Sequence, residues 1–165
     1  RTSLFTDLEA HTAMMQRLGD QAGRGLLRAQ EQITRQALRD HGGDEVKSMG
    51  DGFMASFGSA QKALECAVAL QAAFAAHNEA HEGGEELRVR VGINAGEPIE
   101  EEDDLFGTAV ILAARIAAQA EGGEILVANV VRELTAGKGF LFADRGDRVL
   151  RGFEDPVRVY ELRWR

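Results

Sequence analysis

A short hairpin between two long helical segments is the feature that most constrains what this sequence can fold into. Residues 45–49 and 53–57 are short strand-like segments joined by Gly50-Asp51-Gly52, a pattern typical of a tight β-turn. On either side, residues 12–40 and 60–74 repeat apolar side chains at three- and four-residue steps, which predicts amphipathic helices. A strand pair held between two helices indicates a layered α+β domain.

The remaining segments extend this pattern to a whole domain. Strands are expected at residues 2–8 and 87–95, so the first part of the chain follows the order strand, helix, two strands, helix, strand. An acidic loop with six carboxylates covers residues 97–104, and we expect the rest to contain helices at 106–118 and 129–134, the second capped by Asn129, and strands at 124–127, 140–144, 149–153 and 157–164. We therefore expect a single domain over residues 1–165, with a ferredoxin-like βαββαβ core and a C-terminal α/β extension.

The composition narrows the possible partners. The 165 residues suffice for a core without disulfides, and the only cysteine, Cys66, fits a small core position in an alanine-rich helix. A net charge of −8 argues against nucleic acid as the main partner. No apolar run approaches a membrane span, so we expect no membrane contact by this domain. Because a strand follows Arg1 almost at once, we expect a domain cut from a longer protein, cytoplasmic although its parent could be membrane-tethered.

Two aspartates are the strongest candidates for chemistry. Asp7 ends the first strand, and Asp51 occupies the tip of the hairpin. If these strands are neighbours, the two carboxylates emerge together and need a cation between them, for which magnesium and manganese are suited. The alternative is purely structural, because Asp-Gly is a common hairpin turn and an Asp after a strand often caps a helix. On spacing alone, the structural interpretation is favoured.

Cationic and histidine side chains are weaker signals. Lys47 lies in the first hairpin strand, where a single lysine usually faces solvent. Arg115 shares a helix face with Ile111 and fits either an anionic ligand or a salt bridge to the acidic loop, the second being the simpler local explanation. Arg151 could bind a phosphate or simply lie on the surface of a strand without a ligand. The histidines have no metal-ligand spacing, and no nucleophile elbow, Walker-type loop or dinucleotide fingerprint occurs.

Taken in order, several segments resemble the catalytic domain of class III adenylyl and guanylyl cyclases. The similarity covers nearly the whole chain, and the ordered set is far more specific than any one segment. It consists of Leu4-Phe5-Thr6-Asp7-Leu8-Glu9, His41-Gly42-Gly43, Val46-Lys47-Ser48-Met49-Gly50-Asp51-Gly52-Phe53, Val89-Arg90-Val91-Gly92-Ile93 with Gly96, Asp104-Leu105-Phe106-Gly107-Thr108-Ala109-Val110, Ala113-Ala114-Arg115-Ile116, Gly123-Glu124-Ile125-Leu126-Val127, and Leu150-Arg151-Gly152-Phe153 through Val157 to Tyr160. The resemblance reverses the preference for a purely structural role of the two aspartates.

The resemblance implies a reaction that uses two divalent cations, Mg²⁺ or Mn²⁺. Asp7 and Asp51 match the metal-binding aspartates, with the Leu8 carbonyl as a further metal ligand. Such a site activates the ribose 3′-hydroxyl of ATP for in-line attack on the α-phosphate, which yields 3′,5′-cyclic AMP and pyrophosphate. The phosphate oxygens would meet the backbone N–H groups of Glu9, Ala10, His11 and Thr12, where the chain turns into the first helix.

The same resemblance implies which residues select the base and stabilise the transition state. Lys47 and Asp104 match the purine-reading pair, because a lysine donates to N1 of adenine and a carboxylate accepts from its N6 amine; a one-residue shift would make Asp103 the reader. Arg115 matches the arginine that stabilises the transition state, and Arg151 stands where a phosphate-binding lysine is usual. In this family the site is shared across a head-to-tail homodimer, which implies two equivalent sites.

Position 111 departs from the family pattern. The family usually has an asparagine there that contacts the ribose, whereas this chain has Ile111, which can donate no hydrogen bond. Losing a positioned polar contact commonly lowers the rate about 100-fold or more. The alternatives to an adenylate cyclase are therefore a catalytically weak or silent homology domain that dimerises and transmits a signal, and a guanylate cyclase. A diguanylate cyclase is not supported, because the GGDE of residues 42–45 precedes the hairpin instead of forming it.

Overall fold

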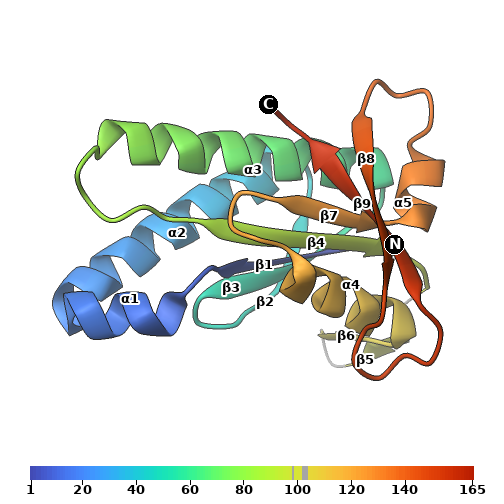
Figure 1. The fold of residues 1–165 in the computed structure, drawn as a ribbon, viewed down its shortest axis with the longest axis horizontal. Coiled ribbons are helices and arrows are strands. Elements are labelled where there is room, and N and C mark those ends of the chain that lie inside the picture. Colours follow the sequence, from blue (N-terminus) through green and yellow to red (C-terminus); the bar gives the residue numbers. More distant parts are fainter. Residues whose placement is uncertain (98, 102–103) are drawn as a thin grey trace.

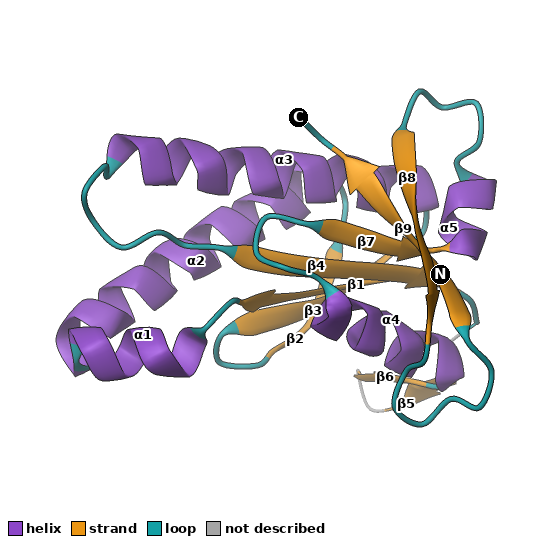
Figure 2. Cartoon of the chain, viewed as in Figure 1, coloured by secondary structure: helices purple, strands orange, loops and turns teal. Residues whose placement is uncertain are grey.

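A seven-stranded mixed sheet with helices on both faces forms the centre of the molecule (Figures 1 and 2). The computed structural model describes residues 1–97, 99–101 and 104–165. In chain order its elements are β1 (Thr2–Leu8), α1 (His11–Leu18), α2 (Asp20–Asp40), β2 (Asp44–Ser48), β3 (Gly52–Phe57), α3 (Ala60–Ala80), β4 (Val89–Ala95), β5 (Ile99–Glu101), β6 (Asp104–Phe106), α4 (Thr108–Gln119), β7 (Ile125–Ala128), α5 (Asn129–Leu134), β8 (Leu141–Arg148) and β9 (Val157–Arg163).

The strand order confirms the expected ferredoxin-like core. The order is β2-β3-β1-β4-β7-β9-β8, in which the first four strands are antiparallel neighbours. The extension continues the same sheet, since β7 pairs in parallel with β4, and β9 then pairs antiparallel with β7 and β8. The fold is thus α+β, with β1 at the centre of the ferredoxin-like part.

Alternating residues of β7 show how the helices divide between the two faces. Ile125 and Val127 are buried in the core beneath α2, α3 and α5, whereas Leu126 and Ala128 are buried in a smaller core beside α4. Successive residues of a strand point to opposite faces, so α4 covers one face alone (Figure 2). Cys66 on α3 lies fully buried in the larger core, and this burial raises the pKa of its thiol to about 12.

The first helix is divided in two. Gly19 has φ 80° and ψ 174°, a conformation that interrupts the helix predicted for residues 12–40 and separates α1 from α2. The apolar periodicity continues across this break because α1 and α2 both pack on the core, and periodicity alone therefore could not locate it.

Three other sequence predictions were wrong. Within the acidic segment, β5 and β6 form a small antiparallel sheet, so this segment is not simply a loop. Residues 149–153 form no strand, because β8 runs on to Arg148 and Val149 is 79% exposed before the chain turns at buried Leu150. Asn129 does not cap α5; Ala128 occupies the cap position, and the Asn129 amide donates to Glu133.

In the described part of the chain, none of the helices combines the length and apolar character required to cross a membrane.

Gly92 on β4 provides a test of how closely α4 packs on the sheet. A Cβ there would lie 2.2 Å from the backbone N of Ala117 and 2.7 Å from the backbone O of Ala113. We expect Gly92→Ala to destabilise the protein by about 1–3 kcal/mol, because the helix must shift. Gly25→Ala is the matched control: Gly25 has open space around it on α2, so alanine should stabilise the protein by about 0.5–1 kcal/mol. Urea unfolding measures the stability of both variants. A Gly92→Ala midpoint equal to that of the wild type would contradict the close packing of α4 on β4.

Candidate functional site

The structure places Asp51 in the turn next to Asp7, at the end of β1. Asp7 pairs with Gly52 across the β1–β3 ladder, so Asp51, the preceding residue, lies next to it. A Cβ at position 52 would stand 2.0 Å from the Thr6 carbonyl oxygen, so glycine is required for this close approach. The Thr6 hydroxyl accepts from the Phe53 N–H at 3.1 Å, and the Gln30 side chain donates to the Asp51 carbonyl at 3.2 Å. The backbone around both aspartates is therefore held by buried polar groups.

Arg90 on β4 is a site residue that the sequence interpretation missed. Its Nε and Nη2 donate to the two carboxylate oxygens of Asp7 at 2.6 and 2.7 Å, and both side chains are only 29% exposed. The hydrogen bond to Asp7 raises the pKa of Arg90, and the negative charges of Asp7, Glu9 and Asp51 add to this, although burial opposes it. Arg90 thus supplies positive charge where two acids converge.

His11, the first residue of α1, contacts the other aspartate. Its Nδ1 lies 3.5 Å from Oδ2 of Asp51, and the side chain is 30% exposed. Its Nε2 is buried and has no hydrogen-bond partner among the described residues. The site therefore brings together four side chains: Asp7 from β1, Asp51 from the β2–β3 turn, Arg90 from β4 and His11 from α1.

The turn between β1 and α1 has an unusual backbone. Ala10 adopts a left-handed conformation, with φ 57° and ψ 35°, and directs the chain into α1. The Glu9 N–H donates to the Arg88 carbonyl at 2.8 Å, while its carboxylate accepts from the Gly122 N–H at 2.6 Å. The backbone N–H and the carboxylate of Glu9 thus both have hydrogen-bond partners within the protein. Ala10, His11 and Thr12, in contrast, begin a helix whose first N–H groups have no partner within the helix.

Lys47 and Asp104 lie on neighbouring strands. Lys47 is on β2, opposite Met54, next to a register shift between Glu45 and Lys47. Asp104 begins β6, which contacts β2 although the two strands belong to different sheets. Asp103, the alternative base reader, lies outside the described residues.

Arg115 and Arg151 form a second cluster that is separate from the aspartates. The Nε of Arg115, on α4, donates to the Arg151 carbonyl at 3.2 Å. Ile111, one helical turn earlier, is 48% exposed. Within the described part of one chain, neither arginine contacts Asp7 or Asp51, and neither forms an ion pair. Within the described part of one chain, the two arginines are thus not bonded to the aspartates.

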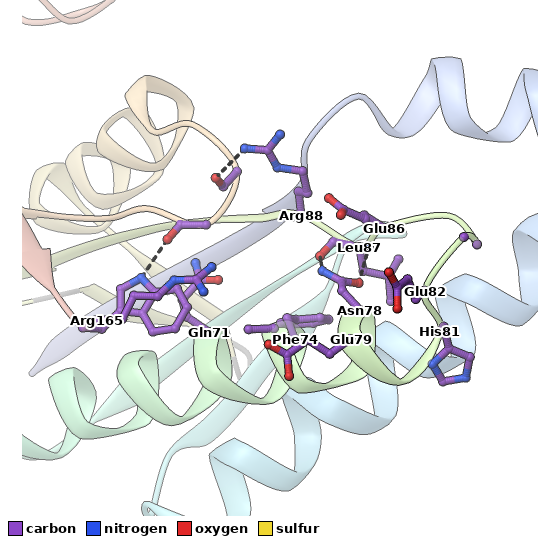
Figure 3. Close-up of a pocket in the computed structure, with 16 residues that line it drawn as sticks. Gln71, Phe74, Asn78, Glu79, His81, Glu82, Glu86, Leu87, Arg88 and Arg165 are labelled. Atoms are coloured by element: carbon purple, nitrogen blue, oxygen red, sulfur yellow. Dashed lines mark hydrogen bonds between the residues drawn. The ribbon is translucent and has the colours of Figure 1, made fainter.

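A pocket of about 540 Å³ lies elsewhere, between the end of α3, the 81–88 segment and the C-terminal residues (Figure 3). Phe74, Asn78 and His81 line it, together with Arg88, whose guanidinium donates to the Gly122 carbonyl at 3.3 Å. None of the predicted site residues lines this pocket. The Asp7 and Asp51 side chains, each 29% exposed, lie outside it.

Comparison with known proteins identifies the fold and the family. The adenylate and guanylate cyclase catalytic domain family matches residues 2–163. The chain belongs to this family. A Rhizobium meliloti protein named "Putative adenylate cyclase 3" is 33% identical over 95% of the chain. The crystal structure of an adenylate/guanylate cyclase/hydrolase from Silicibacter pomeroyi is 32% identical, with a TM-score of 0.85 over 98% of this chain and 94% of that one. A guanylyl cyclase, Cya2, is 26% identical, with a TM-score of 0.84 over 98% of this chain and 90% of that one.

These similarities establish a cyclase catalytic domain and no finer activity. The chain spans 27% of the length of the Rhizobium meliloti relative. Adenylate and guanylate cyclases both occur among the similar proteins, and the preferred purine therefore depends on this chain's own residues.

Cyclase domains of this family use divalent cations, and the aspartate pair fits such ions. Two carboxylates with adjacent backbones are the hard oxygen ligands that Mg²⁺ and Mn²⁺ prefer. Among the described residues no three acidic, histidine or cysteine side chains already converge as a complete metal site. At Asp7, both carboxylate oxygens instead accept hydrogen bonds from Arg90. A cation that binds Asp7 has to replace this guanidinium.

Arg90→Gln tests this competition. Loss of two charged hydrogen bonds should lower the free energy of unfolding by about 1–3 kcal/mol and leave the neighbouring carboxylates without a cation. Mn²⁺ should then raise the melting temperature of the variant more than that of the wild type. Arg88→Gln is the control, because Arg88 is 54% exposed and lies 3.6 Å from Glu9. Equal Mn²⁺-dependent shifts in Arg90→Gln and wild type, measured by differential scanning fluorimetry, would argue against competition.

Proposed function

We propose that this chain is an adenylate cyclase domain that converts ATP to 3′,5′-cyclic AMP and pyrophosphate. The observation that carries the proposal is the juxtaposition of Asp7 and Asp51 at the end of β1, with Arg90 as their counter-ion. Two half-buried carboxylates placed together repel one another unless positive charge lies between them. Such an arrangement is costly for stability alone, and it suits a site that binds cations and a polyphosphate.

In the proposed reaction, Asp7, Asp51 and the Leu8 carbonyl would hold two divalent cations, Mg²⁺ or Mn²⁺. Bound there, the cations supply activation of the ribose 3′-hydroxyl and neutralisation of phosphate charge. The 3′-oxygen forms a bond to the α-phosphorus as the bond to the β-phosphate oxygen breaks, pyrophosphate leaves, and the hydroxyl proton passes to solvent. Arg90, once released from Asp7, remains at the same strand end as a cation for the phosphates.

The β1–α1 turn is suited to receive phosphate oxygens. Backbone N–H groups at a helix start carry partial positive charge and lack partners within the helix. Ala10, His11 and Thr12 provide these groups, whereas the Glu9 N–H already donates to Arg88. We therefore assign the phosphate contacts to the N–H groups of Ala10, His11 and Thr12. Glu9 has a different role, which is to anchor the turn to Gly122.

Lys47 and Asp104 are the residues proposed to select adenine. An ammonium group can only donate and a carboxylate only accept, which matches N1 and the N6 amine of adenine and opposes the pattern of guanine. The contact between β2 and β6 is consistent with a joint role of these residues.

The distribution of the remaining residues favours a shared site. Arg115 and Arg151 lie together but apart from Asp7 and Asp51 in one chain. A head-to-tail homodimer would bring the Arg115 surface of one protomer to the aspartates of the other, giving two equivalent sites. In this arrangement Arg115 would stabilise charge on the transition state and Arg151 would bind phosphate.

A silent homology domain is the second candidate, and Ile111 favours it. This exposed side chain shares the helix face of Arg115 and offers no hydrogen bond to a ribose. A silent domain could retain the fold and the dimer while lacking turnover.

Cyclic nucleotide production by the purified protein, with ATP or GTP and with Mg²⁺ or Mn²⁺, tests the main proposal. We expect cyclic AMP chiefly from ATP, with specific activity rising with protein concentration because the site is shared. Asp51→Ala should reduce the rate at least about 100-fold through loss of a cation ligand. Asp44→Ala is the matched control, because Asp44 lies on the same hairpin, pairs with Arg1 and is 77% exposed.

The absence of any product from a folded, dimeric protein would instead support the silent domain. Ile111→Asn should then restore turnover if this single side chain is the cause. If that variant is also inactive, the loss of activity lies elsewhere in the site.

Base selection has its own test. The double change Lys47→Glu with Asp104→Gly should shift the kcat/KM ratio from ATP toward GTP by at least about tenfold, because unmatched donors and acceptors at a base edge are penalised. Lys138→Glu, a charge reversal outside the predicted site residues, should leave the ratio unchanged. An intact ATP preference in the double variant would refute the assignment of these residues as base readers.

A further inference from the structure

We propose that the imidazole of His11 is a further metal ligand beside Asp51, and that it biases the site toward Mn²⁺ over Mg²⁺. This inference rests on the proposed function, since it assumes that Asp7 and Asp51 hold cations. It assigns a role to the His11 side chain, whose residue has so far contributed only a backbone N–H group.

The spacing between His11 and Asp51 supports the proposal. Nδ1 of His11 and Oδ2 of Asp51 are 3.5 Å apart. This is longer than the roughly 2.7–3.2 Å of an N–H···O hydrogen bond. It is also about 0.5 Å longer than the distance of about 3 Å that separates adjacent ligands of an octahedral cation, each about 2.1 Å from the metal. A small movement of either side chain would therefore allow both atoms to bind one ion.

The surroundings of the ring agree with this role. His11 is 30% exposed, so Nδ1 faces the partly open aspartate pair while its other nitrogen, Nε2, is buried. Nε2 has no hydrogen-bond partner among the described residues, so the protein itself does not satisfy the polarity of this ring. Coordination of Nδ1 would give the ring a strong polar contact. Because Nε2–H would still lack the acceptor that usually supports a histidine ligand, the contribution to affinity should be moderate.

The chemistry of the imidazole determines which cation benefits. Mg²⁺ keeps oxygen ligands and several waters, whereas imidazole nitrogen is a better ligand for first-row transition metals. A site of two carboxylates alone would discriminate little between Mg²⁺ and Mn²⁺. Adding His11 should lower the dissociation constant for Mn²⁺ while leaving that for Mg²⁺ nearly unchanged.

Pulsed electron paramagnetic resonance of bound Mn²⁺ tests the proposal directly. The full chain, labelled with nitrogen-15 in its histidines only, is mixed with Mn²⁺ and an ATP analogue lacking the 3′-hydroxyl, so that no reaction occurs. We expect a nitrogen-15 coupling to Mn²⁺ in the wild type. His11→Gln should abolish this coupling and raise the Mn²⁺ dissociation constant about tenfold or more. His11→Phe provides a second variant should the glutamine protein fold poorly.

Two controls separate this proposal from the one it rests on. His81→Gln removes a histidine at the far end of α3 and should leave the coupling intact. Asp51→Ala should abolish Mn²⁺ binding at the site. If Mn²⁺ binds in an Asp51-dependent manner without any nitrogen-15 coupling, the role of His11 is overturned and the aspartate site stands. If no binding depends on Asp51, both proposals are overturned.

Discussion

Pairing of β1 with β3 on one side and β4 on the other is the constraint on which the candidate site depends. These two ladders place the Asp51 turn next to Asp7 and bring Arg90 opposite the same aspartate. Only glycine at position 52 permits the close approach of β3. A half-buried carboxylate at a strand end is costly unless it is paired, and the bidentate contact from Arg90 meets this requirement. The same register therefore stabilises the sheet and assembles a charged cluster.

The candidate site residues form two groups within the described part of one chain. The aspartates, Arg90 and the β1–α1 turn lie together, while Arg115 and Arg151 lie on a surface formed by α4 and the segment before β9. The pocket near α3 contains none of the predicted residues. A partner that covers the aspartates would exclude water and strengthen the electrostatic contacts there. This is the physical reason for favouring a shared site over a self-contained one.

The core of the fold could be predicted from sequence because its signals are local. The hairpin at Gly50-Asp51-Gly52 and the apolar periodicity of α2 and α3 each depend on residues close together in the chain. The break at Gly19 was not located, because apolar side chains continue on both sides of it. The β5–β6 pair was missed because carboxylates dominate that segment and conceal the strand pattern. Val149 was assigned to a strand, although it lies exposed in the segment that follows β8.

For the site, the sequence by itself determined which residues are candidates for chemistry, and the tertiary structure decided which of them meet. An ordered set of motifs, recognisable in the sequence alone, singles out Asp7, Asp51, Lys47 and Arg115. The partnership of Arg90 with Asp7, across 83 residues, depends on the register of β1 against β4, and the approach of His11 to Asp51 depends on the turn at Ala10. Strand register and backbone direction are set by the packing of the whole sheet, so no local pattern in the sequence could specify these contacts.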